Sequence, residues 1–159
     1  MSAAAAAARL GARVVLAEQG AVLGGRSAWD GSSIESAPAD KWLSSTSESL
    51  SRSPCTRILT RTTAVGYYDH DVVTLLESLP ESDRVLGAPR ERYWIVRANR
   101  VVLASGAIEQ PLVFCNNDRP GVILAGAVRE YLRRFAVSVG QRVLVATNND
   151  LYGDRKSVV

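Results

Sequence analysis

The chain has 159 residues, 47% of them hydrophobic, which is enough for one core but short for a two-domain enzyme. Its 19 basic and 16 acidic residues are spread along the sequence, so no basic tract points to a nucleic-acid partner. Three arginines at positions 129, 133 and 134 can share one helix face, and we interpret them as a solvated surface.

Cysteine spacing and hydropathy indicate in which cellular compartment the protein is expected. Cys55 and Cys115 are far apart and fit no metal-ligand or redox spacing, which argues against a metal site or a disulfide framework. No apolar stretch approaches the roughly 18 residues that a bilayer span needs, and the alanine-rich start lacks the features of a signal peptide. We therefore expect a protein of the reducing cytoplasm with no membrane segment.

The first expected elements are a helix and a strand that ends on an acid. Residues 3–10 are strong helix formers that stop at Gly11, and residues 12–18 are rich in β-branched residues and end at Glu18. This order is typical of the second half of a dinucleotide-binding βαβ unit, whose glycine-rich turn precedes such an acid by about 20 residues. That interval passes Met1, so we expect the first strand, the turn and its phosphate-binding helix end to be missing.

Glu18 and the loop after it are the first candidates for ligand binding. A strand-end carboxylate can accept hydrogen bonds from both hydroxyls of a ribose, although a solvent-exposed acid is the alternative. In the following loop, two adjacent glycines can approach a ligand closely or simply form a turn. Arg26 could pair with a phosphate or be a surface arginine. We assign to cofactor binding Glu18, Gln19, Gly24, Gly25, Arg26 and Ser27.

The middle of the chain predicts one helix and several strands. Residues 36–52 are polar and serine-rich, and we expect a structural helix over residues 38–51. The strands that follow suggest a small antiparallel meander inserted between the halves of a parallel sheet, with a polar tip at residues 80–89. His70, the one histidine, lacks a nucleophile or metal partner, so we interpret it as a turn residue and assign no catalytic residue. The expected strands cover residues 56–60, 64–70, 72–76 and 93–97.

The last third begins with an apolar strand, residues 100–107, that ends in small residues. Small residues at the end of a strand let the backbone lie against a flat, charged ligand. An amphipathic helix is expected at residues 125–136 and a further strand at residues 142–147. We assign to cofactor binding Ser105, Gly106 and Ala107.

These elements predict an α/β fold, an incomplete FAD/NAD(P)-binding Rossmann-like parallel sheet with an inserted antiparallel β-meander. Residues 1–141 would form the dinucleotide-binding domain without its first strand and glycine-rich turn, and residues 142–153 would begin a truncated second domain. Residues 154–159 match the product of a common sequencing adapter, and we interpret them as an artefact. Because open α/β sheets bind ligands at the carboxyl ends of their strands, residues 18–27 and 105–107 should meet at one edge.

Several segments resemble the alpha subunit of heterotetrameric sarcosine oxidase, a member of the two-dinucleotide-domain reductase superfamily. The most specific is the sequence NNDRPGV at residues 116–122, within a similar stretch at residues 108–127. The likeness extends over most of residues 2–152, but residues 36–53 contribute little to it. Subunits of opine oxidase and of cyanide-forming enzymes are close alternatives.

The resemblance implies a central segment of a large subunit that holds NAD where relatives hold FAD. It also implies FMN between the alpha and beta subunits, and a beta subunit that carries FAD and oxidises the secondary amine sarcosine. Gamma and delta-like subunits complete the oxidase, and electrons reach oxygen as peroxide. Within this chain, the resemblance implies that Ala64 and Val65 offer backbone groups to adenine, and that Ser105 stands where many relatives have threonine.

From this resemblance we expect the complete subunit to support oxidative demethylation of sarcosine. We expect the 159-residue piece itself to be inactive and to have little dinucleotide affinity. The alternatives are an opine or amino-acid dehydrogenase-type subunit and a non-catalytic assembly module.

Overall fold

The computed structural model describes residues 1–34, 36–81, 87 and 89–147. The chain forms two compact units, Met1–Ala104 and Ser105–Val159. The domain limits expected after residues 141 and 153 stay predictions, and the proposed artefact at residues 154–159 lies outside the described residues.

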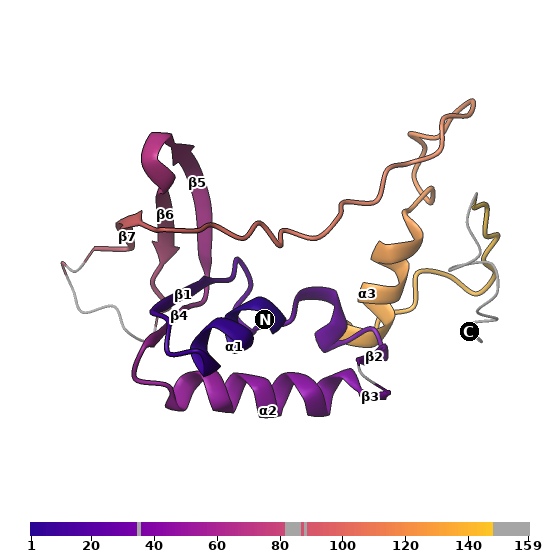
Figure 1. The fold of residues 1–159 in the computed structure, drawn as a ribbon. Coiled ribbons are helices and arrows are strands. Elements are labelled where there is room, and N and C mark those ends of the chain that lie inside the picture. Colours follow the sequence, from indigo (N-terminus) through magenta and orange to yellow (C-terminus); the bar gives the residue numbers. More distant parts are fainter. Residues whose placement is uncertain (35, 82–86, 88, 148–159) are drawn as a thin grey trace. The chain divides into compact units, whose positions relative to one another are not determined.

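The first unit begins with helix α1, and a β–α–β arrangement follows it. Strands β1 and β4 pair in parallel, with Val14 opposite Thr56, and helix α2 precedes β4 in the chain. Helices α1 and α2 contact each other, α1 also contacts β1, and α2 also contacts β4 (Figure 1). The two helices and the first strand were expected at these positions. Their bounds are α1 Ser2–Arg9, β1 Val14–Ala17, α2 Ala39–Arg52 and β4 Thr56–Leu59.

Strand β4 is a correction to the sequence prediction. Its residues were expected to open the antiparallel meander, but they pair in parallel with β1. The physical reason is the 14-residue helix between the β1 loop and β4, since a helical crossover returns the chain so that the next strand runs in the same direction. The parallel sheet in the described residues therefore consists of β1 and β4.

The antiparallel meander follows β4 and has the strand order β5-β6-β7. A β-bulge interrupts the pairing of β5 with β6 between Ala64 and Gly66. The three strands confirm the predicted meander, and the polar tip expected at residues 80–89 lies largely outside the described residues. The strands are β5 Thr62–Tyr68, β6 Val72–Ser78 and β7 Glu91–Arg97; the short pair β2 Ser33–Ile34 and β3 Ala37–Pro38 lies before α2.

Trp94 of β7 joins the meander to the parallel sheet. Its indole Nε1–H donates to the Glu77 carboxylate at 2.8 Å, and Arg92 donates to the same oxygen at 3.1 Å. The guanidinium carbon of Arg57, from β4, lies 5.3 Å from the centre of the indole ring, within cation–π range. One aromatic side chain thus contacts residues of three strands.

We expect Trp94→Phe to lower the free energy of unfolding by about 2 kcal/mol, because the Glu77 carboxylate loses a donor in a half-buried position. The measurement is urea unfolding followed by circular dichroism. Tyr93→Phe is the matched control, since Tyr93 is exposed, and should change stability by less than about 0.5 kcal/mol. Equal effects of the two variants would contradict this role of Trp94.

The core of the first unit is small and rich in leucine. Most of its buried residues belong to α2, to the strands or to the loop before α2, and Thr62 and Thr74 are the buried polar residues among those described. Leu50 of α2 is the largest fully buried apolar side chain. The buried apolar residues are Ala4, Leu23, Ala39, Leu43, Leu50, Leu59 and Leu75.

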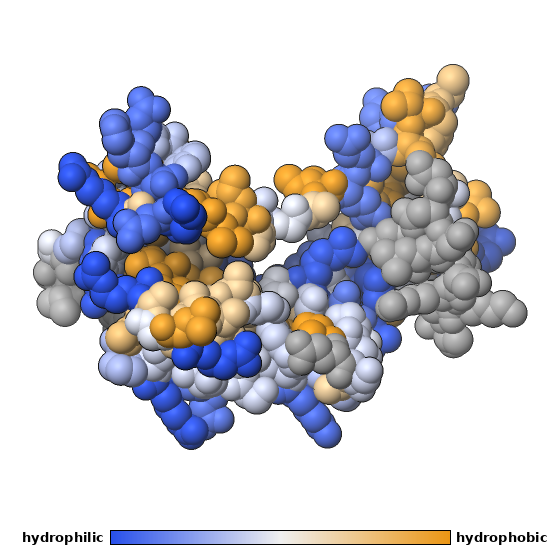
Figure 2. All heavy atoms as spheres, in the orientation of Figure 1, coloured by the Kyte–Doolittle hydropathy of each residue, from blue (hydrophilic) through white to orange (hydrophobic). Residues whose placement is uncertain are grey.

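Two predicted strands do not form. The segments at residues 100–104 and 142–147 are not strands, and Leu103 and Leu144 are exposed. An apolar, β-branched sequence becomes a strand only when a neighbour supplies partners for its backbone N–H and C=O groups, and the described residues supply none here. Leu103 and Leu144 are among the exposed large apolar side chains of the chain. Figure 2 shows apolar surface next to hydrophilic surface.

The second unit contains the expected amphipathic helix, α3 (Ala125–Phe135). The Glu109 carboxylate accepts the Gly126 N–H at 2.7 Å and so caps the first turn of this helix. The NNDRPGV segment forms consecutive turns before the helix, and the Asn117 side-chain amide donates to the Leu112 carbonyl at 3.0 Å. In the described part of the chain, no helix has the length and apolar character needed to cross a membrane.

Candidate functional site

Glu18 lies at the carboxyl end of β1 and links three segments. Its N–H donates to the Leu59 carbonyl and its carbonyl accepts the Thr62 N–H, each at 2.9 Å. Its carboxylate Oε1 accepts the Gly20 N–H at 2.9 Å. Among the described residues, the side-chain hydrogen bonds of Glu18 engage Oε1 alone. The carboxylate is therefore held at the rim of the parallel sheet with a second oxygen still able to accept.

The glycine loop, defined here as residues 24–27, follows the buried Leu23. Gly24 and Gly25 have φ angles of +108° and +53°, which are in the left-handed region that favours glycine. The Ser27 N–H donates to the Gly24 carbonyl at 3.2 Å and closes a short 3-10 helix, η1 (Gly25–Ala28). Gly25 and Arg26 are exposed, so the loop presents its second glycine and the arginine to solvent.

Backbone hydrogen bonds connect the start of β5 with the rim of the parallel sheet at which Glu18 lies. Thr62 bonds to Glu18, and the Arg61 N–H donates to the Gly20 carbonyl at 2.9 Å. Ala64 and Val65 follow directly and are exposed at the β-bulge. They line a hollow of about 240 Å³ together with Gly66, Tyr67, Val73, Val101 and Leu103. The five residues after Val65 lie outside the predicted site, because strand pairing and the path of residues 101–103 bring them to this position.

The predicted site residues therefore fall into two sets. The first set lies in the first unit. It includes the exposed Gln19 and also Glu18, whose carbonyl accepts the N–H of Thr62, two residues before Ala64. Ser105, Gly106 and Ala107 open the second unit, where they are exposed and form no strand. Their role in cofactor binding stays a prediction.

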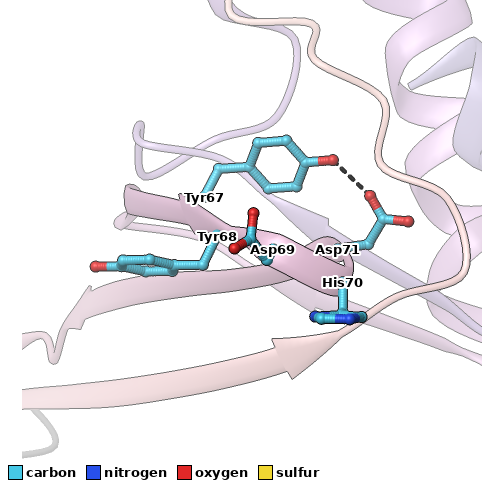
Figure 3. Close-up of a pocket in the computed structure, with 5 residues that line it drawn as sticks. All are labelled: Tyr67, Tyr68, Asp69, His70 and Asp71. Atoms are coloured by element: carbon cyan, nitrogen blue, oxygen red, sulfur yellow. Dashed lines mark hydrogen bonds between the residues drawn. The ribbon is translucent and has the colours of Figure 1, made fainter.

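The β5–β6 turn forms a second hollow, of about 360 Å³, shown in Figure 3. The Tyr67 hydroxyl donates to the Asp71 carboxylate, whereas the His70 imidazole points away from this pair (Figure 3). His70 and Asp71 have φ angles of 61° and 53°, so both support a tight turn. The position expected for His70 in a turn is confirmed. No group of three His, Cys, Asp or Glu side chains among the described residues could hold a metal ion.

The hydrogen bond to Asp71 raises the pKa of Tyr67 above the usual 10.0, with smaller contributions from burial and from the Asp71 charge. A raised pKa means that the folded state favours the neutral phenol. The stability from this bond is therefore complete below the usual tyrosine pKa and is lost as the pH rises through the higher folded value.

We expect Asp71→Gly to lower the pKa of Tyr67 towards 10.0, since glycine keeps the left-handed backbone but removes the acceptor. Tyrosine ring shifts in an alkaline NMR titration measure the change. Asp69→Ala, in the same turn, should leave the Tyr67 titration in place. An unchanged titration in Asp71→Gly would show that the bond does not govern this phenol.

Comparisons with known proteins identify similar sequences and one similar structure. No protein-family model matches the chain. The chain is 44% identical to the sarcosine oxidase subunit alpha of Corynebacterium sp. strain P-1 over 155 residues, which cover 94% of this chain and 16% of that protein. It is 41% identical to the same subunit of Rhizobium meliloti strain 1021 over 152 residues, covering 94% and 15%, respectively.

A solved structure shares the fold. The crystal structure of L-proline dehydrogenase from P. horikoshii matches with a TM-score of 0.63 and 26% sequence identity, covering 87% of this chain and 28% of that one. This match confirms the predicted α/β class. Sarcosine oxidase and L-proline dehydrogenase are both names of oxidoreductases. The chain spans about a sixth of the length of the curated relatives. The predicted resemblance is confirmed: over 94% of its length, this chain is a homologue of one segment of the sarcosine oxidase alpha subunits.

Proposed function

We propose that this chain is the segment of an oxidoreductase alpha subunit that binds a dinucleotide, NAD in the first instance and FAD as the alternative. The observation that carries the proposal is the placement of Glu18. Its carboxylate is fixed at the carboxyl end of a parallel strand, where open α/β sheets bind their ligands. Homology to sarcosine oxidase alpha subunits supports the same assignment.

The residues present fit such a cofactor. Glu18 Oε2 would accept hydrogen bonds from the ribose hydroxyls while Oε1 keeps the loop in place. A Cβ added to Gly25 would meet no atom within 4 Å, so its backbone is open to a pyrophosphate, and Arg26 beside it carries the opposite charge. Ala64 and Val65 would offer backbone groups to adenine next to the partly apolar hollow. A bound dinucleotide supplies two-electron redox chemistry, and this chain binds and orients it.

The whole protein is proposed to oxidise a secondary amine in the cytoplasm. Sarcosine and L-proline, which appear in the names of the relatives, are both secondary amino acids. In the complete oxidase, a beta subunit would oxidise sarcosine, FMN would lie between the alpha and beta subunits, and gamma and delta-like subunits would complete the assembly. Electrons would pass through flavin to oxygen.

The test is peroxide release by the complete subunit co-expressed with its beta partner. Sarcosine should give peroxide, with glycine as the matched control because it lacks the N-methyl group. Turnover of L-proline or of an opine without turnover of sarcosine would favour the amino-acid dehydrogenase alternative. The structural similarity to L-proline dehydrogenase supports that alternative.

Calorimetry separates the enzyme proposal from the third possibility, a non-catalytic assembly module. Titration of the complete subunit with NAD and then with FAD should give saturable heat with at least one of them. Heat with neither dinucleotide, in a subunit that still assembles with its partners, would support the assembly module and exclude the binding proposal.

A further inference from the structure

Helix α2 connects the glycine loop with the parallel sheet. Its buried residues Ala39, Leu43 and Leu50 are spaced so that they lie on one helix face. The helix contacts η1, β2 and β3 as well as α1 and β4. Because a helix is stiff over this length, it can hold the loop in a defined place beside the strands of its own unit.

Leu43 makes the contact between this helix and the glycine loop. A Cβ added to Gly24 would lie 2.7 Å from both Leu43 methyl carbons, Cδ1 and Cδ2. This is closer than real Cβ atoms approach another carbon, so Leu43 occupies the space in which a side chain at position 24 would begin. Leu43 is buried, and so is Leu23, which directly precedes Gly24 in the chain. The contact of Leu43 with Gly24 is therefore part of the core.

The two adjacent glycines therefore have different environments. Gly24 packs inward against Leu43, whereas Gly25 has no heavy atom within 4 Å of its ideal Cβ position. The exposed part of the loop thus begins directly after an anchored residue. A loop held in its binding geometry loses less conformational freedom when a ligand binds, and this raises affinity without any new contact.

We infer that Leu43 is a positioning residue, which acts on a ligand solely through the backbone at Gly24 and Gly25. The inference rests on the proposed function for the identity of that ligand. The packing of Leu43 against Gly24 does not depend on it.

Hydrogen exchange in the 159-residue chain tests the packing. The reporter amides are Ser27, Trp29 and Asp30, which donate to loop carbonyls at 3.0–3.2 Å. Leu43→Ala should speed their exchange by about tenfold. Leu75→Ala removes an equally buried leucine from β6 and should change the same amides by less than about twofold. Equal acceleration by both variants, or none by Leu43→Ala, would overturn the inference.

Gly24→Ala gives an independent check. It should speed loop exchange in both backgrounds, because alanine is strained at the left-handed φ of +108°. The acceleration should be larger when Leu43 is present, because the contact of the new Cβ with the Leu43 methyl carbons adds to that strain. Gly25→Ala should have the same effect in both backgrounds, because the strain of its left-handed backbone does not depend on Leu43. If Leu43→Ala does not fold, Leu43→Met is measured instead and should give a smaller acceleration in the same amides; no acceleration there would also count against the inference.

The ligand measurement uses the complete subunit and NAD. Leu43→Ala should raise the Kd for NAD by about tenfold, and Glu48→Ala, which removes an exposed carboxylate from the same helix, should leave it unchanged. If the unmodified subunit binds neither NAD nor FAD, the proposed function fails, while the exchange experiment still decides the role of Leu43. If it binds NAD and Leu43→Ala leaves the Kd unchanged, the inference fails and the proposed function stands.

Discussion

Replacing Glu18 by alanine in the complete subunit should weaken NAD binding by about 10- to 100-fold. A hydrogen bond to a charged group contributes about 1.5–3 kcal/mol, and about 1.4 kcal/mol corresponds to a factor of ten in affinity. The variant removes the carboxylate that would accept the ribose hydroxyls, together with the acceptor that holds the Gly20 N–H at 2.9 Å. Calorimetric titration with NAD gives the change in Kd.

Two further variants separate the charge of Glu18 from its support of the loop. Glu18→Gln keeps an oxygen for the Gly20 N–H and removes the charge, so we expect an intermediate loss of affinity. Glu48→Ala breaks an exposed ion pair with Arg52 on α2 and should leave NAD binding unchanged. Wild-type affinity in Glu18→Ala would exclude Glu18 from the binding site.

Replacing Leu50 by alanine should lower the free energy of unfolding by about 3 kcal/mol, the largest stability effect we expect in the first unit. Leu50 is 1% exposed, on the helix that contacts α1 and β4. Removing three carbons leaves a cavity there, and a small core offers few neighbours that could move to fill it. Urea unfolding followed by circular dichroism measures the difference.

The matched control is Leu10→Ala, because Leu10 is 88% exposed and follows the last residue of α1. It should change stability by less than about 0.5 kcal/mol. A loss below about 1 kcal/mol in Leu50→Ala would show that α2 is not packed as described.

Local sequence patterns were sufficient for the helices and the meander. The spacing of Ala39, Leu43 and Leu50 gives α2 one apolar face, and a helix needs partners only within its own segment. Runs of β-branched and aromatic residues in β5, β6 and β7 likewise identified strands whose neighbours follow closely in the chain. Such elements can be predicted from the sequence because their hydrogen-bonding partners are close in the chain.

The same reasoning failed where a strand depends on a distant partner. Residues 56–59 have the same strand character in either sheet, and pairing with β1 across α2 decided their place. Residues 100–104 have an apolar strand sequence but no pairing neighbour in the described part of the chain, so they form no strand. Composition predicts that a segment can be a strand, whereas pairing decides whether it is one.

The candidate site divides in the same way. Glu18 and the paired glycines were recognisable because an acid at a strand end and two adjacent glycines are local features. The hydrogen bond from Thr62 to Glu18, the contact of Leu43 with Gly24 and the hollow beside Ala64 join residues far apart in the chain. Residue order alone thus determined which chemical groups were available. Only the tertiary structure decided which of these groups lie close together. Contacts between distant residues depend on how helices and strands pack, and local sequence patterns do not determine this packing.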